Sequence, residues 1–142
     1  MGHVFADVTL KNATDMGNAR NGQIKEENVR SIAVRALVDT GATMLCMNEE
    51  IRQKLGLKII GSSPIRIANG TWLTCQVTEP VEIIWTNRNA ALYAYVVPGL
   101  DNALLGVIPL EAMDLIVNPN TQQLEGAHGD QPRFLAMSSF LG

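Results

Sequence analysis

An apolar strand that runs directly into Asp39-Thr40-Gly41 is the feature that most constrains this chain. Residues 29–38, VRSIAVRALV, alternate apolar and polar side chains and then become wholly apolar, which predicts a strand that ends in the core. Such a strand would deliver Asp39 to an interior position. A buried carboxylate is costly unless it is hydrogen-bonded, and Gly41 allows a tight loop whose backbone N–H groups reach it. The hydroxyl of Thr40 could lock that loop by donating to a facing carbonyl.

Short alternating segments, separated by turn residues, fill most of the remaining chain. Residues 4–10 predict a first strand, and residues 11–28, rich in Asn, Gly and charge, predict an exposed loop. Asn69-Gly70 stands between two alternating segments, which predicts a hairpin over about 65–77 around a two-residue turn.

A short helix is expected after the Asp39 segment, with Asn48 as its N-cap and Gly56 as its stop. The other expected elements are strand 80–85, turn 86–89, strand 90–97, an apolar stretch around Gly106, helix 109–113, strand 115–117 and one or two weak strands in the tail. Many short strands and little helix predict a mainly β fold. We expect a closed barrel with one or two short helices, in a single domain over residues 1–142.

Composition excludes several classes of partner. The 142 residues carry a formal net charge of -3 without a run of Lys or Arg, which argues against nucleic acid. No apolar run is long enough to span a bilayer and the N-terminal segment has no leader pattern, so no membrane is expected. Cys46 and Cys75 form neither a CxxC pair nor a metal-ligand spacing, which suits a reducing compartment. A cytoplasmic protein is therefore expected.

One aspartate is a weak catalyst for peptide hydrolysis, because the reaction needs a base for the water and an acid for the leaving amine. Two carboxylates in contact share one proton and their pKa values split, so that one acts as base and the other as acid. Taken alone, an Asp-Thr-Gly sequence more often marks a capped loop than a catalytic site.

The segment ALVDTGAT, residues 36–43, resembles the active-site motif of the retropepsin-like aspartic proteases. The order of later segments is also similar: a hairpin around Asn69-Gly70, strands over 80–97, the apolar Leu104-Leu105-Gly106 and then a short helix. The resemblance covers about residues 29–118, and the tail LEGAHGD resembles cellular, prokaryotic members of this family.

The resemblance implies roles for particular residues. Asp39 would be the catalytic aspartate, Thr40 would make an interchain hydroxyl-to-backbone bond at the base of the dyad, and Gly41 would present its backbone to substrate. The other implied substrate-binding residues, in the loop, the pocket and the covering flap hairpin, are Ala42, Ala68, Asn69, Gly70, Trp72, Pro98, Leu100 and Leu104. No metal or other cofactor is implied.

Two departures from the viral members are visible. Those members carry an acid where Thr43 stands and an arginine where Val107 stands, so their internal salt bridge cannot form here. Trp72 is also unusual in a flap and is equally compatible with cross-strand packing. Met44, Cys46 and Met47 are expected in the core or an interface.

The number of motifs predicts the assembly. No other aspartate of the chain is followed by Thr/Ser-Gly, so an aspartic protease built from this chain must be a homodimer with its site on the two-fold axis. The expected function is peptide or protein hydrolysis by a water held between Asp39 and its copy in the partner. A non-catalytic pepsin-like dimerisation or peptide-binding domain is the alternative. An aspartyl-phosphate enzyme is disfavoured, because no phosphate-binding loop or second acidic motif accompanies Asp39.

Overall fold

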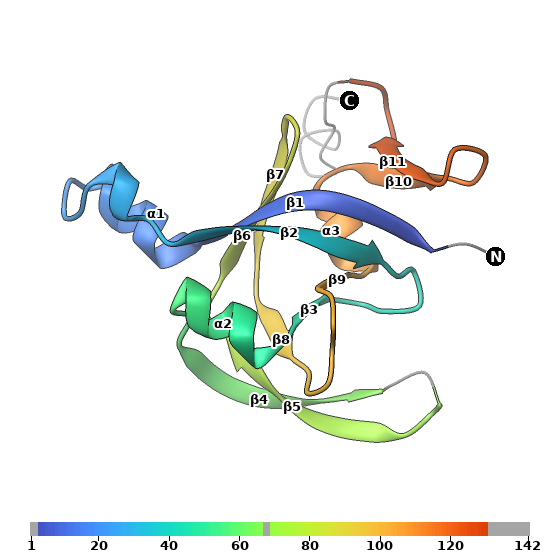
Figure 1. Cartoon of the computed structure of the whole chain (residues 1–142), viewed down its shortest axis with the longest axis horizontal. Helices are drawn as coiled ribbons and strands as arrows, with labels where there is room; N and C mark the ends of the chain where they lie inside the picture. The colour runs from blue at the N-terminus through green and yellow to red at the C-terminus, as the bar shows by residue number, and fades with distance from the viewer. Residues whose placement is uncertain (1–2, 67–68, 131–142) are drawn as a thin grey trace, which may run out of the picture.

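Short β-strands hold more residues than helices do in the computed structural model, which describes residues 3–66 and 69–130 (Figure 1). The predicted mainly β class is confirmed. The elements are β1 (Val4–Asn12), α1 (Ala13–Arg20), the 3-10 helix η1 (Glu26–Asn28), β2 (Ser31–Val38), β3 (Leu45–Met47), α2 (Glu49–Leu55), β4 (Ile59–Arg66), β5 (Trp72–Thr78), β6 (Val81–Trp85), β7 (Arg88–Leu92), β8 (Ala94–Val96), β9 (Leu104–Leu105), α3 (Val107–Ala112), β10 (Leu115–Asn118) and β11 (Gln123–Gly126).

Nine of these strands form one sheet in the order β4-β5-β8-β3-β9-β2-β1-β6-β7, and β10 pairs with β11 separately. The two-residue strand β9 lies between β2, to which it is parallel, and β3, to which it is antiparallel. The sheet ends at β4 and at β7, and no ladder joins these two strands among the residues described. The centre of the sheet therefore brings together segments that are far apart in the sequence.

The hydrophobic core lies against this central region. Leu10 of β1, Leu45 of β3, Leu55 of α2, Ile83 of β6 and Leu105 of β9 are all fully buried. Full burial of a large aliphatic side chain contributes about 1.5 to 3 kcal/mol, so these contacts fix β3 and β9 in place despite their short lengths. No helix in the described parts of the chain is long and apolar enough to cross a membrane.

The predicted helix after Asn48 is confirmed, including both of its ends. The Asn48 side chain accepts a hydrogen bond from the backbone N–H of Ile51, and Gly56 ends α2 with a φ of 61°. Ile51 and Leu55 are its buried residues, one turn apart. These signals are local, which is why the sequence is sufficient to place this helix.

The prediction of one long exposed loop over residues 11–28 is wrong, because it contains α1 and η1. The described residues thus contain three α-helices, where one or two were expected. Asn12 caps α1 by accepting a hydrogen bond from the N–H of Asp15, which is the one buried residue of that helix. A helix that buries a carboxylate instead of an apolar stripe gives no hydrophobic periodicity to recognise.

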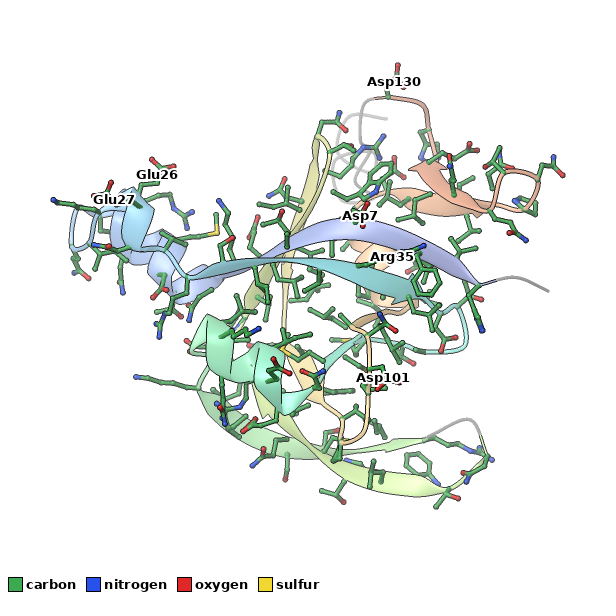
Figure 2. The ribbon with its side chains drawn as sticks, in the orientation of Figure 1. Asp7, Glu26, Glu27, Arg35, Asp101 and Asp130 are labelled. Atoms are coloured by element: carbon green, nitrogen blue, oxygen red, sulfur yellow. The ribbon has the colours of Figure 1, made fainter. Side chains whose placement is uncertain are left out.

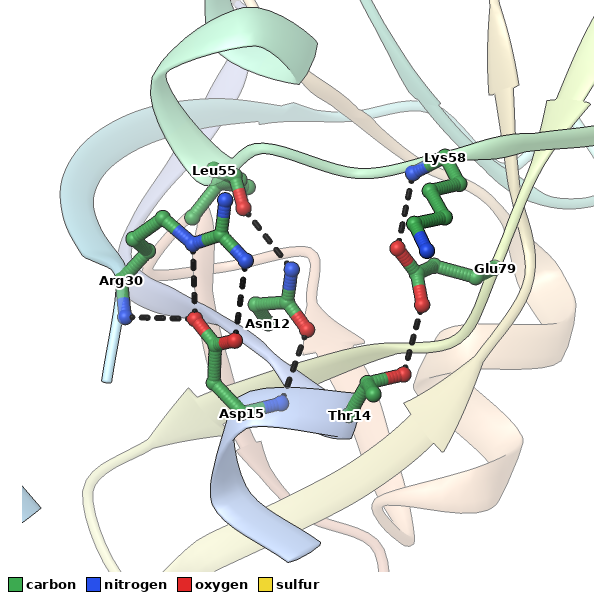
Figure 3. A network of polar contacts seen from close by, with 7 residues as sticks. All are labelled: Asn12, Thr14, Asp15, Arg30, Leu55, Lys58 and Glu79. Carbon is green, nitrogen blue, oxygen red and sulfur yellow. Dashed lines mark hydrogen bonds and ion pairs between the residues drawn. The ribbon is translucent and has the colours of Figure 1, made fainter. Parts of the chain in front are cut away.

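A polar network holds α1 against the rest of the fold (Figure 3). Asp15 accepts hydrogen bonds from the Arg30 backbone N–H at 3.0 Å and from its guanidinium at 2.8 and 2.9 Å. Asn12, which is fully buried, donates to the Leu55 carbonyl at 2.9 Å and so connects β1 to α2. Glu79 accepts from the Thr14 hydroxyl and from the Lys58 backbone N–H.

Replacing Asp15 with Asn should lower the free energy of unfolding by about 1 kcal/mol at pH 7, and the loss should disappear in acid. The hydrogen bond from the Arg30 side chain is the main reason that the pKa of Asp15 lies below its usual value of 3.8. A lowered folded-state pKa gives stability that is present above the unfolded-state pKa and lost as pH falls through the folded-state value. Urea denaturation at neutral and acid pH measures this difference.

Asp7→Asn is the matched control, because Asp7 is exposed on β1 (Figure 2) and forms no ion pair in the described parts of the chain. Equal stability of Asp15→Asn and wild type at pH 7 would contradict the role given to the Asp15–Arg30 pair.

The predicted hairpin around Asn69-Gly70 is found as β4 and β5, which pair as far as Arg66 and Trp72. Residues 67 and 68 lie outside the described residues. Asn69 accepts a hydrogen bond from the Thr71 N–H at 2.9 Å. A side-chain-to-backbone bond of this kind is typical of Asn in a turn.

The next hairpin also differs from its prediction. The turn is Thr86-Asn87 alone, and Arg88 belongs to β7, where it pairs with Trp85. The Arg88 side chain is buried and donates to the backbone carbonyls of Met113, Asp114 and Gly129. Long-range partners therefore draw this arginine out of the predicted turn.

The predicted strand 90–97 is divided at Tyr93. Its first part, in β7, pairs with β6, whereas β8 pairs with β3 and β5. The predicted helix 109–113 and strand 115–117 are found, with shifted ends, as α3 and β10, and β11 is one of the weak strands expected in the tail. Residues 131–142 lie outside the described residues.

Candidate active site

Asp39 follows β2 directly and is fixed to the centre of the sheet. Its backbone N–H donates to the Leu105 carbonyl of β9 at 2.9 Å. Because β9 lies between β2 and β3, the chain must leave β2, turn at Asp39 and return on the other side of β9. The order of strands therefore creates the loop of residues 39–44.

The loop is closed by its own hydrogen bonds. The Gly41 N–H donates to Oδ1 of Asp39 at 2.9 Å, and the Ala42 N–H donates to the Asp39 carbonyl at 3.0 Å. The first of these bonds confirms the expected contact between the loop backbone and the carboxylate. It aims one oxygen of Asp39 at the loop and leaves the other oxygen without a hydrogen bond in the described parts of the chain.

Backbone hydrogen bonds from the start of α3 also support the loop of residues 39–44. The backbone N–H groups of Gly106, Val107 and Ile108 donate to the carbonyls of Met44, Ala42 and Thr43 at 3.1, 3.0 and 2.9 Å. A Cβ atom on Gly106 would lie 2.5 Å from the Thr43 carbonyl carbon and 2.7 Å from two carbonyl oxygens. Position 106 therefore accommodates only glycine without a shift of the loop.

Asp39 is half-buried in one chain, so the predicted interior position is only partly reached. Thr40, next to it, is exposed, and its hydroxyl makes no hydrogen bond within the described parts of the chain. Both residues thus remain accessible on the face where β2 ends. In Figure 1 this β2–β3 loop and the free end of the β4–β5 hairpin lie on the same side of the molecule.

A cavity of about 660 Å³ lies between the Asp39 loop and the β4–β5 hairpin. It is lined by Asp39, Gly41, Ala42, Thr43, Cys46, Ile65, Arg66, Val97, Leu100 and Leu104. A second cavity of about 300 Å³ shares several of these residues and extends to Met44, Pro64, Trp72 and Tyr95. Together we call these two cavities the groove. Its walls are mainly apolar, which suits an extended peptide whose side chains are apolar.

The groove contains some of the predicted site residues and not others. Those that line it are Asp39, Gly41, Ala42, Trp72, Leu100 and Leu104. Four others, Thr40, Asn69, Gly70 and Pro98, are exposed and outside the lining. Ala68 lies outside the described residues. The exposed position of Trp72, beside Arg66 on the hairpin, favours a groove contact over buried cross-strand packing.

Cys46, Ile65, Arg66, Val97 and Tyr95 line the groove but were not expected there. No local pattern marks them, because β3, β8 and β5 meet only through long-range pairing. Burial raises the pKa of the Cys46 thiol to about 11, with smaller contributions from Cys75 and Asp39. A thiol with this pKa is protonated at neutral pH, so it is a poor nucleophile.

Residues 12–112 match the sequence model of the family described as "gag-polyprotein putative aspartyl protease". The match covers most of the chain and includes β2, the Asp39 loop, the hairpin and α3. The chain belongs to this aspartyl protease family.

Two solved structures are similar to the chain in fold. A retropepsin-like aspartic protease from Rickettsia conorii superposes with a TM-score of 0.52 at 16% identity, over 82% of this chain and 77% of that one. The protease of simian foamy virus (mac) gives a TM-score of 0.45 at 16% identity, over 77% and 91% of the two chains. No curated protein matches the chain. The first likeness shows a retropepsin-like fold.

Backbone hydrogen bonds support the Asp39 loop at the two positions, Thr43 and Val107, where the resemblance implied that a salt bridge is missing. Val107 and Ile108 reach the loop through their backbone N–H groups, which donate to the carbonyls of Ala42 and Thr43. These bonds do not depend on charge. The support of the Asp39 loop should therefore persist at acid pH.

Proposed function

We propose that this chain is a homodimeric aspartic endopeptidase in which Asp39 and the same residue of the partner form the catalytic dyad. One observation carries this proposal: Asp39 is the one acidic residue among the described residues that line the groove. A single carboxylate cannot serve as base and acid together, so a second copy has to supply the other. The half-exposed Asp39 and exposed Thr40 support a site that a partner completes.

In the proposed reaction, a water molecule lies between one ionised and one protonated Asp39. The ionised carboxylate accepts a proton from the water while the water oxygen attacks the peptide carbonyl carbon. The protonated carboxyl donates its proton to the carbonyl oxygen, which gives a tetrahedral intermediate. When the C–N bond breaks, the amine nitrogen takes a proton from one carboxyl and the other carboxylate accepts one from the intermediate. The dyad thus ends with one proton, as it began.

The remaining residues would position this chemistry. Thr40 would donate its hydroxyl to a backbone carbonyl of the partner, and Gly41 would present its backbone to the substrate. The peptide would lie against Ala42, Leu100 and Leu104 and under the hairpin that carries Trp72. The proposal also gives Pro98, Asn69 and Gly70, which lie outside the lining of the groove, and Ala68, which lies outside the described residues, a contact with the peptide. No metal or other cofactor takes part, and the two free cysteines support a reducing, cytoplasmic setting.

Sedimentation together with a cleavage assay on an unfolded protein, at about pH 4 to 6, tests this function. We expect a dimer that cleaves the substrate and is inhibited by a statine-type mimic of the tetrahedral intermediate. A stable dimer that binds peptides without cutting them would instead favour the non-catalytic peptide-binding domain. A strict monomer, or an optimum above neutral pH, would contradict the proposed dyad because the dyad must hold one proton.

A further inference from the structure

Arg66 is a cation in a groove that is otherwise mainly apolar. It lies at the end of β4 and lines both cavities of the groove. No other Lys or Arg is present among the described lining residues, and Asp39 is their sole acid. The groove therefore presents one positive charge in addition to its catalytic carboxylate.

Arg66 has no Asp or Glu partner among the described residues. All 14 Asp and Glu residues of the chain lie in its described parts, and none of them forms an ion pair with Arg66. By contrast, Arg30 and Arg52 are each paired with a carboxylate. The Arg66 side chain also makes no hydrogen bond with the described residues, so with respect to them its donors are available for a ligand.

The guanidinium of Arg66 lies near the tip of the hairpin. A Cβ atom placed on Gly70 would lie 3.6 Å from Nη2 of Arg66. Trp72 pairs directly with Arg66 across the two strands and is 63% exposed. Arg66 is exposed in the chain alone. A bound peptide that covers Arg66 and Trp72 would exclude water from an ion pair with Arg66, which strengthens that pair relative to an open surface.

We propose that Arg66 is a specificity-determining residue that selects peptides with an acidic side chain at one position beneath the hairpin. This inference rests on the proposed function, because it assumes that a peptide occupies the groove. The planar guanidinium can donate two parallel hydrogen bonds to a carboxylate, which the neutral amide of Gln cannot match. The preference is thus for charge and shape together.

Peptide binding to the Asp39→Asn variant tests the inference without requiring cleavage. The probes are fluorescein-labelled peptides of Ala, Val and Leu that carry one Glu, moved through each position, and the same peptides with Gln. At about pH 6, where Glu is ionised, we expect roughly fivefold tighter binding of the Glu peptide at one position. The preference for the Glu peptide should fade as pH falls through the pKa of Glu, about 4.3.

Arg66→Met in the same background should remove this preference, and Arg66→Glu should transfer it to the matching Lys peptide. Arg20→Met is the control, because Arg20 is exposed on α1 and makes no ion pair in the described parts of the chain. Thermal melts of each variant show whether it is folded, and Arg66→Lys should keep part of the preference if Arg66→Met does not fold.

Equal binding of Glu and Gln peptides at every position, or a preference that survives in Arg66→Met, would overturn the inference. Cleavage by the wild-type protein without any preference for Glu would overturn it while leaving the proposed function intact. A Glu preference in a protein that never cleaves peptides would support the role of Arg66 and would contradict the proposed endopeptidase function.

Discussion

Replacing Asp39 with Asn should reduce kcat/KM by about a thousandfold or more and leave the fold unchanged. An amide can neither accept the proton of the attacking water nor share a proton with its copy. The amide oxygen of Asn can still accept the hydrogen bond that the Gly41 N–H gives to Asp39. Because Asp39 is half-buried and outside the core, the substitution removes chemistry without removing packing.

Cleavage of a peptide library measures this loss, and circular dichroism with sedimentation shows whether the variant still folds and dimerises. Asp101→Asn is the matched control, because Asp101 is an exposed aspartate after β8 (Figure 2) and outside the lining of the groove. Full activity of Asp39→Asn would show that the catalytic residue has been assigned wrongly.

Replacing Gly106 with Ala should damage both stability and activity, although Gly106 belongs to neither the groove lining nor the proposed dyad. The added methyl group would lie within 2.7 Å of backbone atoms of the 42–44 loop, which cannot rotate away as a side chain would. Overpacking of this kind costs about 1 to 3 kcal/mol, and the easiest relief is a shift of the loop. Such a shift would misplace the Asp39 carboxylate, which sits at the start of the same loop.

Urea denaturation and kcat/KM, measured at a temperature where the variant is folded, separate the two effects. Gly61→Ala is the matched control, because a Cβ atom there meets nothing within 4 Å and the residue is exposed on β4. If Gly106→Ala were as stable and as active as Gly61→Ala, the support of the Asp39 loop by position 106 would be contradicted.

Elements defined by local chemistry could be predicted from the sequence. Helix α2 depends on a side-chain cap at Asn48 and a left-handed residue at Gly56, and each acts within a few residues. The Asp39 loop is likewise signalled by an apolar strand that ends in an acid and a glycine. Helix α1 could not be predicted in this way, because the residue that it buries is Asp15.

Elements defined by long-range pairing could not be predicted. The three residues of β3 are all buried between β8 and β9, which enter the sheet from more than forty positions downstream. The division of the predicted strand 90–97 at Tyr93 has the same cause, because β7 before Tyr93 pairs with β6 and β8 after it pairs with β3.

The residues that line the groove could also be predicted only in part. Asp39, Gly41 and Ala42 could be recognised because they form one short motif, and Leu100 and Leu104 because they follow it at a family-like spacing. Arg66 and Cys46 come into the groove only when β4–β5 folds over the β3–β8 region, which no local pattern encodes. Gly106 was part of the resemblance, but its physical reason, contact with the loop backbone, required the structure.

The activity of mixed dimers tests most directly whether two copies of Asp39 form one site. Wild-type and Asp39→Asn chains are refolded together in equal amounts. The cleavage rate of this mixture is compared with the rate of a wild-type sample at the same total protein concentration. If each site needs both carboxylates, only wild-type homodimers are active, and we expect about one quarter of the wild-type rate. A rate of about one half would show that each chain works independently and would contradict the shared dyad.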